Sequence, residues 1–73
     1  MGQKITIKVR FNSSREKFEK FGNNTYLVYL PFPEDEDAAN VLAGLLSRNI
    51  GVPISRIDFA GQDINKNWIF ELI

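Results

Sequence analysis

The stretch PEDEDAANVLAGLLSRNIGVP, from Pro33 to Pro53, decides the fold because it is the one long helix that the sequence predicts. Its apolar side chains recur at steps of three and four residues, which places them on one side of an α-helix. These side chains are Ala38, Val41, Leu42, Leu45, Leu46 and Ile50. The spacing therefore predicts a helix with one apolar stripe that covers a sheet.

Both ends of this helix carry signals. Asp35 is expected to cap the first turn, and Glu36 and Asp37 add negative charge where the helix dipole favours it. Gly51 suits the left-handed position after the last turn, and Pro53 prevents the helix from continuing.

The residues before the helix predict strands. Lys4 to Phe11 alternates strictly between polar and apolar side chains, which is typical of a half-buried strand. Lys17 to Phe21 fits either a short strand or one helical turn. Gly22-Asn23-Asn24 is a turn sequence, and Thr25 to Leu30 is rich in β-branched and aromatic residues. We favour a hairpin across Gly22–Asn24.

After the helix, a strand is expected from Ile54 to Ala60, a turn from Gly61 to Asn67 and a last strand from Trp68 to Ile73. The last two strands are close in sequence and should pair antiparallel, while the strands entering and leaving the helix allow a parallel pairing. The prediction is an α+β fold in two layers, with one main helix packed on a mixed sheet of four to five strands. Residues 1–73 form a single domain.

Composition excludes several kinds of chemistry. The chain has neither Cys nor His, which removes thiol nucleophiles, disulfides, histidine bases and zinc sites of sulfur or imidazole. We therefore expect no enzyme, no cofactor and no metal site. The acidic run Glu34 to Asp37 suits the helix dipole, whereas four consecutive residues fan out around the axis and do not converge on a cation. No apolar run could span a bilayer, so we expect a cytoplasmic protein that does not contact membranes.

The charge is zero overall but unevenly distributed. Residues 1–30 hold six basic side chains against Glu16 and Glu19, and the rest of the chain is correspondingly acidic. The zero net charge argues against strong unspecific attraction to nucleic acid.

The order of these segments resembles the YggU-like family of small uncharacterised proteins. The most specific match is Gly51-Val52-Pro53-Ile54-Ser55-Arg56-Ile57, which is similar to the family's GVPxSRI segment, and the resemblance covers nearly the whole chain. It implies a helix packed on a mixed sheet, and no established activity. Many members continue into a further helix, which we expect this chain to lack because it stops at Ile73.

Two polar motifs of that family are altered. Members typically read P-x-D-G-K-A-N at the helix start, where this chain has Pro33-Glu34-Asp35-Glu36-Asp37-Ala38-Ala39. The Ser-Gly-x-x-Ser-Arg-x-Lys loop is represented by residues 60–67, in which Gly61 and Lys66 remain. If these motifs form a shared site, that site is degraded here.

The candidate binding residues are basic. They are Lys8, Arg10, Arg15, Arg56 and Lys66, which would contact the phosphates of RNA or DNA. For the basic side of the first strand, a solvated sheet face is the more ordinary explanation. For Arg56, an ion pair with Asp58 or Glu71 is a slightly simpler explanation than a binding role.

The last strand offers a rival site. Trp68 and Phe70 alternate and fit a buried face, so Ile69 and Ile73 should point the other way. An exposed apolar surface there would dock a protein partner or a second copy of the chain. The sequence thus predicts a small binding or scaffold domain, with nucleic acid as the first candidate ligand and a protein partner as the alternative.

Overall fold

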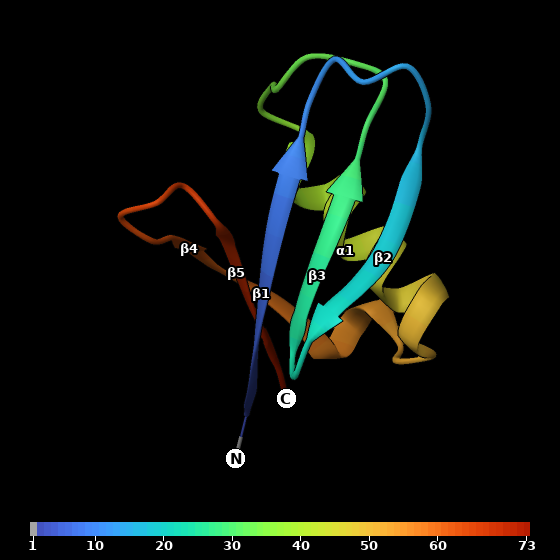
Figure 1. Cartoon of the computed structure of the whole chain (residues 1–73). Coiled ribbons are helices and arrows are strands. Elements are labelled where there is room, and N and C mark those ends of the chain that lie inside the picture. The colour runs from blue at the N-terminus through green and yellow to red at the C-terminus, as the bar shows by residue number, and fades with distance from the viewer. Residues whose placement is uncertain (1) are drawn as a thin grey trace.

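The computed structural model describes residues 2–73 and contains one α-helix and a five-stranded sheet (Figure 1). The elements in chain order are β1 (Gln3–Arg10), β2 (Lys17–Gly22), β3 (Thr25–Tyr29), α1 (Ala38–Ile50), the 3₁₀ turn η1 (Ile54–Arg56), β4 (Ile57–Gln62) and β5 (Trp68–Leu72). The predicted α+β fold with one helix on a mixed sheet is confirmed.

The helix ends as predicted and begins later than predicted. Gly51 adopts the left-handed conformation with φ 74°, and its N–H donates to the carbonyl of Ser47. At the other end the N-cap residue is Asp37, whose side chain makes no capping hydrogen bond. The expectation that Asp35 caps the first turn is wrong, because its carboxylate accepts the N–H of Asp37 (2.9 Å) in a turn that precedes the helix.

The strands are ordered β2-β3-β1-β5-β4, with β1 in the centre. β1 pairs parallel with β3, and every other pairing is antiparallel. β3 and β4, which enter and leave the helix, therefore run in the same direction but are separated by β1 and β5. The sheet is mixed as predicted, yet its parallel pair is β1–β3 and not the two strands that flank the helix.

The hairpin across Gly22–Asn24 is confirmed, since β2 and β3 pair antiparallel. The pairing also shows that Lys17 to Phe21 forms a strand and not a helical turn. The strand expected from Ile54 begins only at Ile57, because Ile54–Arg56 turns as a 3₁₀ segment after Pro53. The antiparallel pairing of the last two strands is also confirmed.

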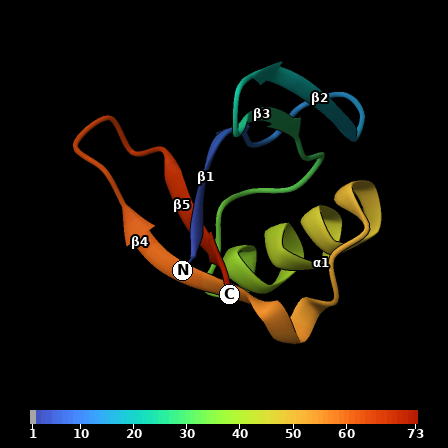
Figure 2. The ribbon, with the colours of Figure 1, turned by 90° about the horizontal axis from the view of Figure 1, so that it is seen from below.

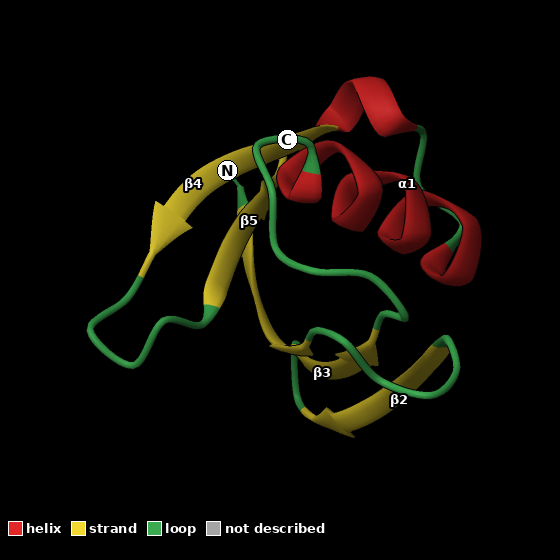
Figure 3. Cartoon of the chain, turned by 90° about the horizontal axis from the view of Figure 1, so that it is seen from above, coloured by secondary structure: helices red, strands yellow, loops and turns green. Residues whose placement is uncertain are grey.

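The core lies between α1 and one face of the sheet, which we call the inner face. The helix buries Ala38, Leu42, Leu45 and Leu46 against strand residues that include Ile7 and Phe70. Figures 2 and 3 show that the sheet is strongly curved, so that β2–β3 and β4–β5 flank the helix. Within residues 2–73, no helix lies over the opposite face, which we call the outer face.

Candidate nucleic-acid interface

Register places basic and aromatic side chains in rows across the outer face. β1 buries Ile5 and Ile7 on the inner face, so Lys8 and Arg10 point to the outer face. Arg10 is paired with Tyr29 of β3, and Tyr29 with Lys17 of β2. One row across three strands is therefore cation, aromatic ring, cation.

The adjacent row is Lys8, Leu27 and Glu19, again one residue from each of β1, β3 and β2. Beside this row lies Phe21, whose ring is 5.4 Å from the Lys8 Nζ atom. The side chain of Phe21 is 63% exposed. An irregularity in the pairing between Lys20 and Gly22 leaves Phe21 at this exposed edge.

The charges on this surface are only partly balanced. Lys17 and Glu19 form an ion pair (2.8 Å), and within residues 2–73 none of Lys8, Arg10 and Arg15 forms one. The pKa of Lys17 is raised, first by its hydrogen bond to Glu19 and then by the charge of that carboxylate, while the positive charge of Arg15 acts in the opposite direction. Arg15 thus adds to the positive potential around Lys17.

An acidic residue, Asp63, lies in the β4–β5 turn near the basic rows. The Asp63 carboxylate accepts the backbone N–H groups of Asn65 and Asn67, both at 2.9 Å. These bonds, led by the one from Asn67, lower the pKa of Asp63, and the positive charge of Lys8 adds to this. The turn is held in shape by its own carboxylate, and its negative charge borders the basic rows.

The predicted basic residues do not gather in one place. Lys8 and Arg10 share the outer face of β1, and Arg15 precedes β2 at one edge of the sheet. Arg56 precedes β4 at the opposite edge, and Lys66 lies in the β4–β5 turn with φ 63°. The structure therefore places Lys8, Arg10 and Arg15 on or beside the β1–β3–β2 surface, and Arg56 elsewhere.

Arg56 also lacks the ion pair that was the simpler expectation. Its Nε–H donates to the backbone carbonyl of Ile73 (2.7 Å), and in the described part of the chain it pairs with neither Asp58 nor Glu71. Asp58 and Glu71 are register partners of each other, and Glu71 is also paired with Lys4 of β1. Asp58 and Glu71 therefore lie on the outer face of the sheet, and the Arg56 side chain does not.

Sequence reasoning missed Lys17, Leu27 and Phe21 as members of this surface. The signal that could have found them is the alternation of Lys17 and Phe21 with the inward-facing Phe18 in β2, and of Leu27 with the buried Val28 in β3. That signal requires Lys17–Gly22 to be a strand, which the local pattern left open. Of the two tyrosines of β3, Tyr26 packs on the core beside Phe18, with ring centroids 5.1 Å apart, and Tyr29 faces outward.

The last strand agrees with its prediction in part. Trp68 and Phe70 are buried, and Ile73 is 58% exposed. Ile69, which was expected to be exposed, is half-buried, and it lies between Thr6 of β1 and Gly61 of β4.

No group of acidic side chains within residues 2–73 has the geometry to hold a metal ion. With 13 residues, α1 is too short to cross a membrane, and no other helix in residues 2–73 is long and apolar enough to do so. Comparison with family models, with curated proteins and with solved structures gave no match. The resemblance to the YggU-like family therefore stays a prediction.

Proposed function

We propose that the outer face of β1, β3 and β2 binds single-stranded nucleic acid, with RNA as the first candidate. The observation that carries the proposal is the placement of Phe21 and Tyr29 on the same face as Lys8, Arg10 and Lys17. Sheet surfaces that bind single strands combine aromatic rings, on which bases stack, with cations that contact the phosphates.

The geometry favours a single strand over a duplex. The surface is an open sheet face, and in the described part of the chain no helix lies over it that could enter a major groove (Figure 2). Exposed rings such as Phe21 contribute only where a base is unstacked and can lie on them. Because the whole chain has no net charge, we expect weak binding, with a Kd of about 10⁻⁵ M near physiological salt.

The test is fluorescence anisotropy with a labelled single-stranded RNA of mixed sequence, its DNA counterpart and the corresponding duplex. If Lys8, Arg10 and Arg15 each contact one phosphate, the logarithm of the affinity should fall with the logarithm of salt with a slope of about −2. A fourfold increase in salt would then weaken binding about 20-fold.

A matched pair of variants locates the surface. Arg10→Ala should weaken binding, whereas Arg48→Ala, which removes the same charge from an exposed position in the last turn of α1, should leave it unchanged. No binding at low salt, or an equal effect of the two substitutions, would reject the proposal.

A protein partner at the last strand is the second candidate, and the exposure of Ile73 favours it. It predicts self-association or partner binding that Ile73→Ser abolishes and Arg10→Ala does not change. Sedimentation equilibrium over a range of protein concentrations distinguishes a second copy of the chain from a different partner.

A further inference from the structure

β4 forms one edge of the sheet, and within residues 2–73 no strand pairs with its open side (Figures 2 and 3). The Ile73 N–H donates to the Arg56 carbonyl (2.9 Å), and in an antiparallel pair bonded and non-bonded positions alternate. Phe59, three residues after Arg56, therefore forms a non-bonded pair with Phe70. Its N–H and C=O groups point to the open edge, where they have no backbone partner in the described part of the chain.

This edge carries none of the residues that usually block the pairing of a further strand. Lysine and proline often protect sheet edges, and β4 (IDFAGQ) contains neither. The opposite edge, β2, contains Lys17 and Lys20. An irregularity in the pairing between Phe59 and Gly61 interrupts β4, so the regular part of its edge is residues 57–59. A short extended segment therefore fits this edge.

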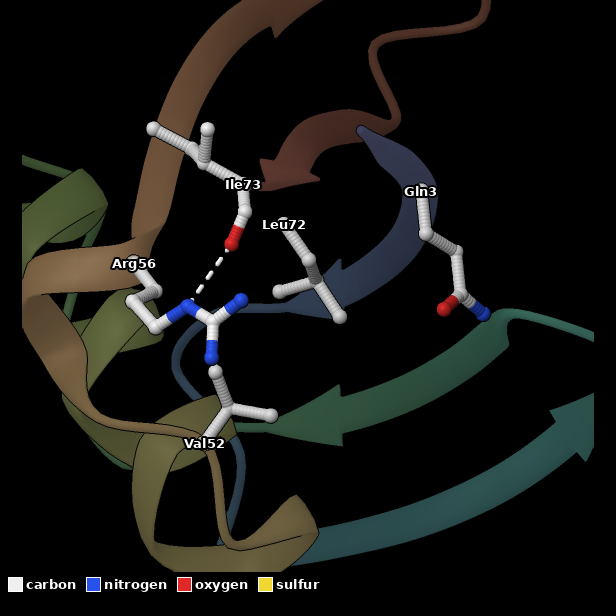
Figure 4. Close-up of a pocket in the computed structure, with 5 residues that line it drawn as sticks. All are labelled: Gln3, Val52, Arg56, Leu72 and Ile73. Atoms are coloured by element: carbon white, nitrogen blue, oxygen red, sulfur yellow. Dashed lines mark hydrogen bonds between the residues drawn. The ribbon is translucent and has the colours of Figure 1, made fainter. Parts of the chain in front are cut away.

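On the outer face, the row that ends at this edge carries an uncompensated charge. Lys4, Glu71 and Asp58 are register partners across β1, β5 and β4. Lys4 lies beside Glu71, whereas Asp58 has only another carboxylate beside it, which is unfavourable for directly opposed residues. Arg56, two residues before Asp58, donates its Nε–H to the backbone oxygen of Ile73 (2.7 Å; Figure 4) and within residues 2–73 forms no ion pair. A cation on an added strand would lie directly opposite Asp58.

On the inner face, the adjacent row ends in an exposed aromatic ring. Ile5, Phe70 and Phe59 are register partners across the same three strands. Ile5 and Phe70 are buried, but Phe59 is 46% exposed. Its ring packs beside those of Phe70 and Trp68, with centroids 5.3 and 5.4 Å away. An apolar side chain on an added strand would cover the open side of this ring.

From these two rows we infer that the open edge of β4 binds an extended segment of a partner protein, in which a basic residue is next to an apolar one. The backbone of the segment bonds to the free groups of Phe59. Its basic side chain faces Asp58 on the outer face, and its apolar side chain packs on the Phe59 ring on the inner face. This edge is separate from the nucleic-acid surface, which lies on β1, β3 and β2.

A second copy of the chain does not meet this requirement. Antiparallel pairing of two β4 strands about Phe59 sets Asp58 opposite Ala60, and β4 contains no basic residue. The other open edge, β2, has its Lys17 already paired with Glu19 (2.8 Å). A different protein therefore supplies the cation.

The experiment is an NMR titration of isotopically labelled protein with the capped peptide acetyl-TVKVKVT-amide. The lysine peptide should shift the amides of residues 57–62 with a Kd of about 1 mM. At about four times this concentration it should slow hydrogen exchange of the Phe59 amide about fivefold, because that N–H is unpaired in the free protein. The comparison peptide acetyl-TVEVEVT-amide should bind about tenfold more weakly, since attraction to Asp58 becomes repulsion. The lysine peptide with methylated amide nitrogens should cause neither effect.

Substitutions at Asp58 then test the charge. Asp58→Asn should weaken binding of the lysine peptide about threefold, and Asp58→Lys should make the glutamate peptide the tighter ligand. Both changes remove the like-charge contact with Glu71, so the fold should be kept. Glu16→Gln removes an exposed acid beside β2 at the other edge and should change neither affinity.

Three results would each overturn the inference: equal binding of the two charged peptides, an unchanged affinity of Asp58→Asn, or no protection of the Phe59 amide by the lysine peptide. Protection of that amide in the protein alone, increasing with protein concentration, would assign the edge to a second copy and would overturn it as well.

Discussion

The Nζ atom of Lys8 lies 5.4 Å from the centre of the Phe21 ring, although the two residues belong to strands that are not neighbours in the sheet. β3 lies between them and presents Leu27 at that level. A cation over an aromatic face is attracted by the ring's quadrupole, worth about 0.5–1 kcal/mol at exposed sites. The contact keeps the exposed Phe21 ring beside a positive charge. In the proposed binding of a single strand, a base would stack on the ring and the cation would contact a phosphate.

Phe21→Ala should weaken binding of single-stranded RNA about fivefold or more, because stacking of a base on a ring contributes about 1–3 kcal/mol. The free energy of unfolding should change by no more than about 0.5 kcal/mol, since the ring is largely exposed. Ile64→Ala, which removes a 97% exposed apolar side chain from the β4–β5 turn, is the control. Anisotropy measures the first quantity and urea denaturation the second, and equal affinities of the two variants would argue against stacking on Phe21.

Leu42→Ala should destabilise the fold by about 2–5 kcal/mol, because Leu42 is fully buried in the apolar stripe of α1. Ile64→Ala should lie within about 0.5 kcal/mol of the unchanged protein. Urea unfolding can be followed by the fluorescence of Trp68, the single tryptophan, which packs beside Phe59 with ring centroids 5.4 Å apart. A small effect of Leu42→Ala would mean that α1 does not pack on the sheet as described.

Two glycines of the helical segment should respond in opposite directions to alanine. Gly44 lies inside α1, and a Cβ atom there meets nothing within 4 Å, so Gly44→Ala should stabilise the protein by about 0.5–1 kcal/mol. Gly51 has φ 74°, where a side chain is strained, so Gly51→Ala should destabilise it by about 1 kcal/mol. Thermal or urea unfolding of both variants checks the signs, and effects of the same sign would contradict the position of the helix end.

Asp63 should titrate below its ordinary pKa of 3.8, because the N–H groups of Asn67 and Asn65 bond to its charged form. A carboxyl group with a lowered pKa in the folded state contributes stability that is fully present above its unfolded pKa. That contribution is lost as the pH falls through the folded value. Asp63→Asn should therefore lose less stability than the unchanged protein on acidification below about pH 4.

NMR titration of the Asp63 side-chain carboxyl carbon measures this pKa directly. A value at or above 3.8 would show that the turn does not hold the carboxylate as described. The comparison with Asp63→Asn by urea unfolding at two pH values isolates this group from the other acids.

The sequence by itself determined the elements whose signals are local. The apolar spacing around Leu42 and the glycine at position 51 predicted the helix and its end, and the alternation of Lys4 to Phe11 predicted both faces of β1. These predictions hold because the spacing of apolar side chains and the left-handed residue that ends a helix both depend on residues that are close in the chain. The start of β4 was misplaced because Ile54 is apolar but sits in a 3₁₀ turn that follows a proline.

Only the tertiary structure decided which strands are neighbours. β1 is inserted between β3 and β5, which pairs Arg10 with Tyr29 and brings Phe21 to Lys8, while Arg56 is carried to the opposite edge. Strand order and register follow from burying the inner faces of all five strands together under one helix. That requirement involves residues far apart in the chain, so no local pattern of Lys8, Phe21 or Arg56 contains it.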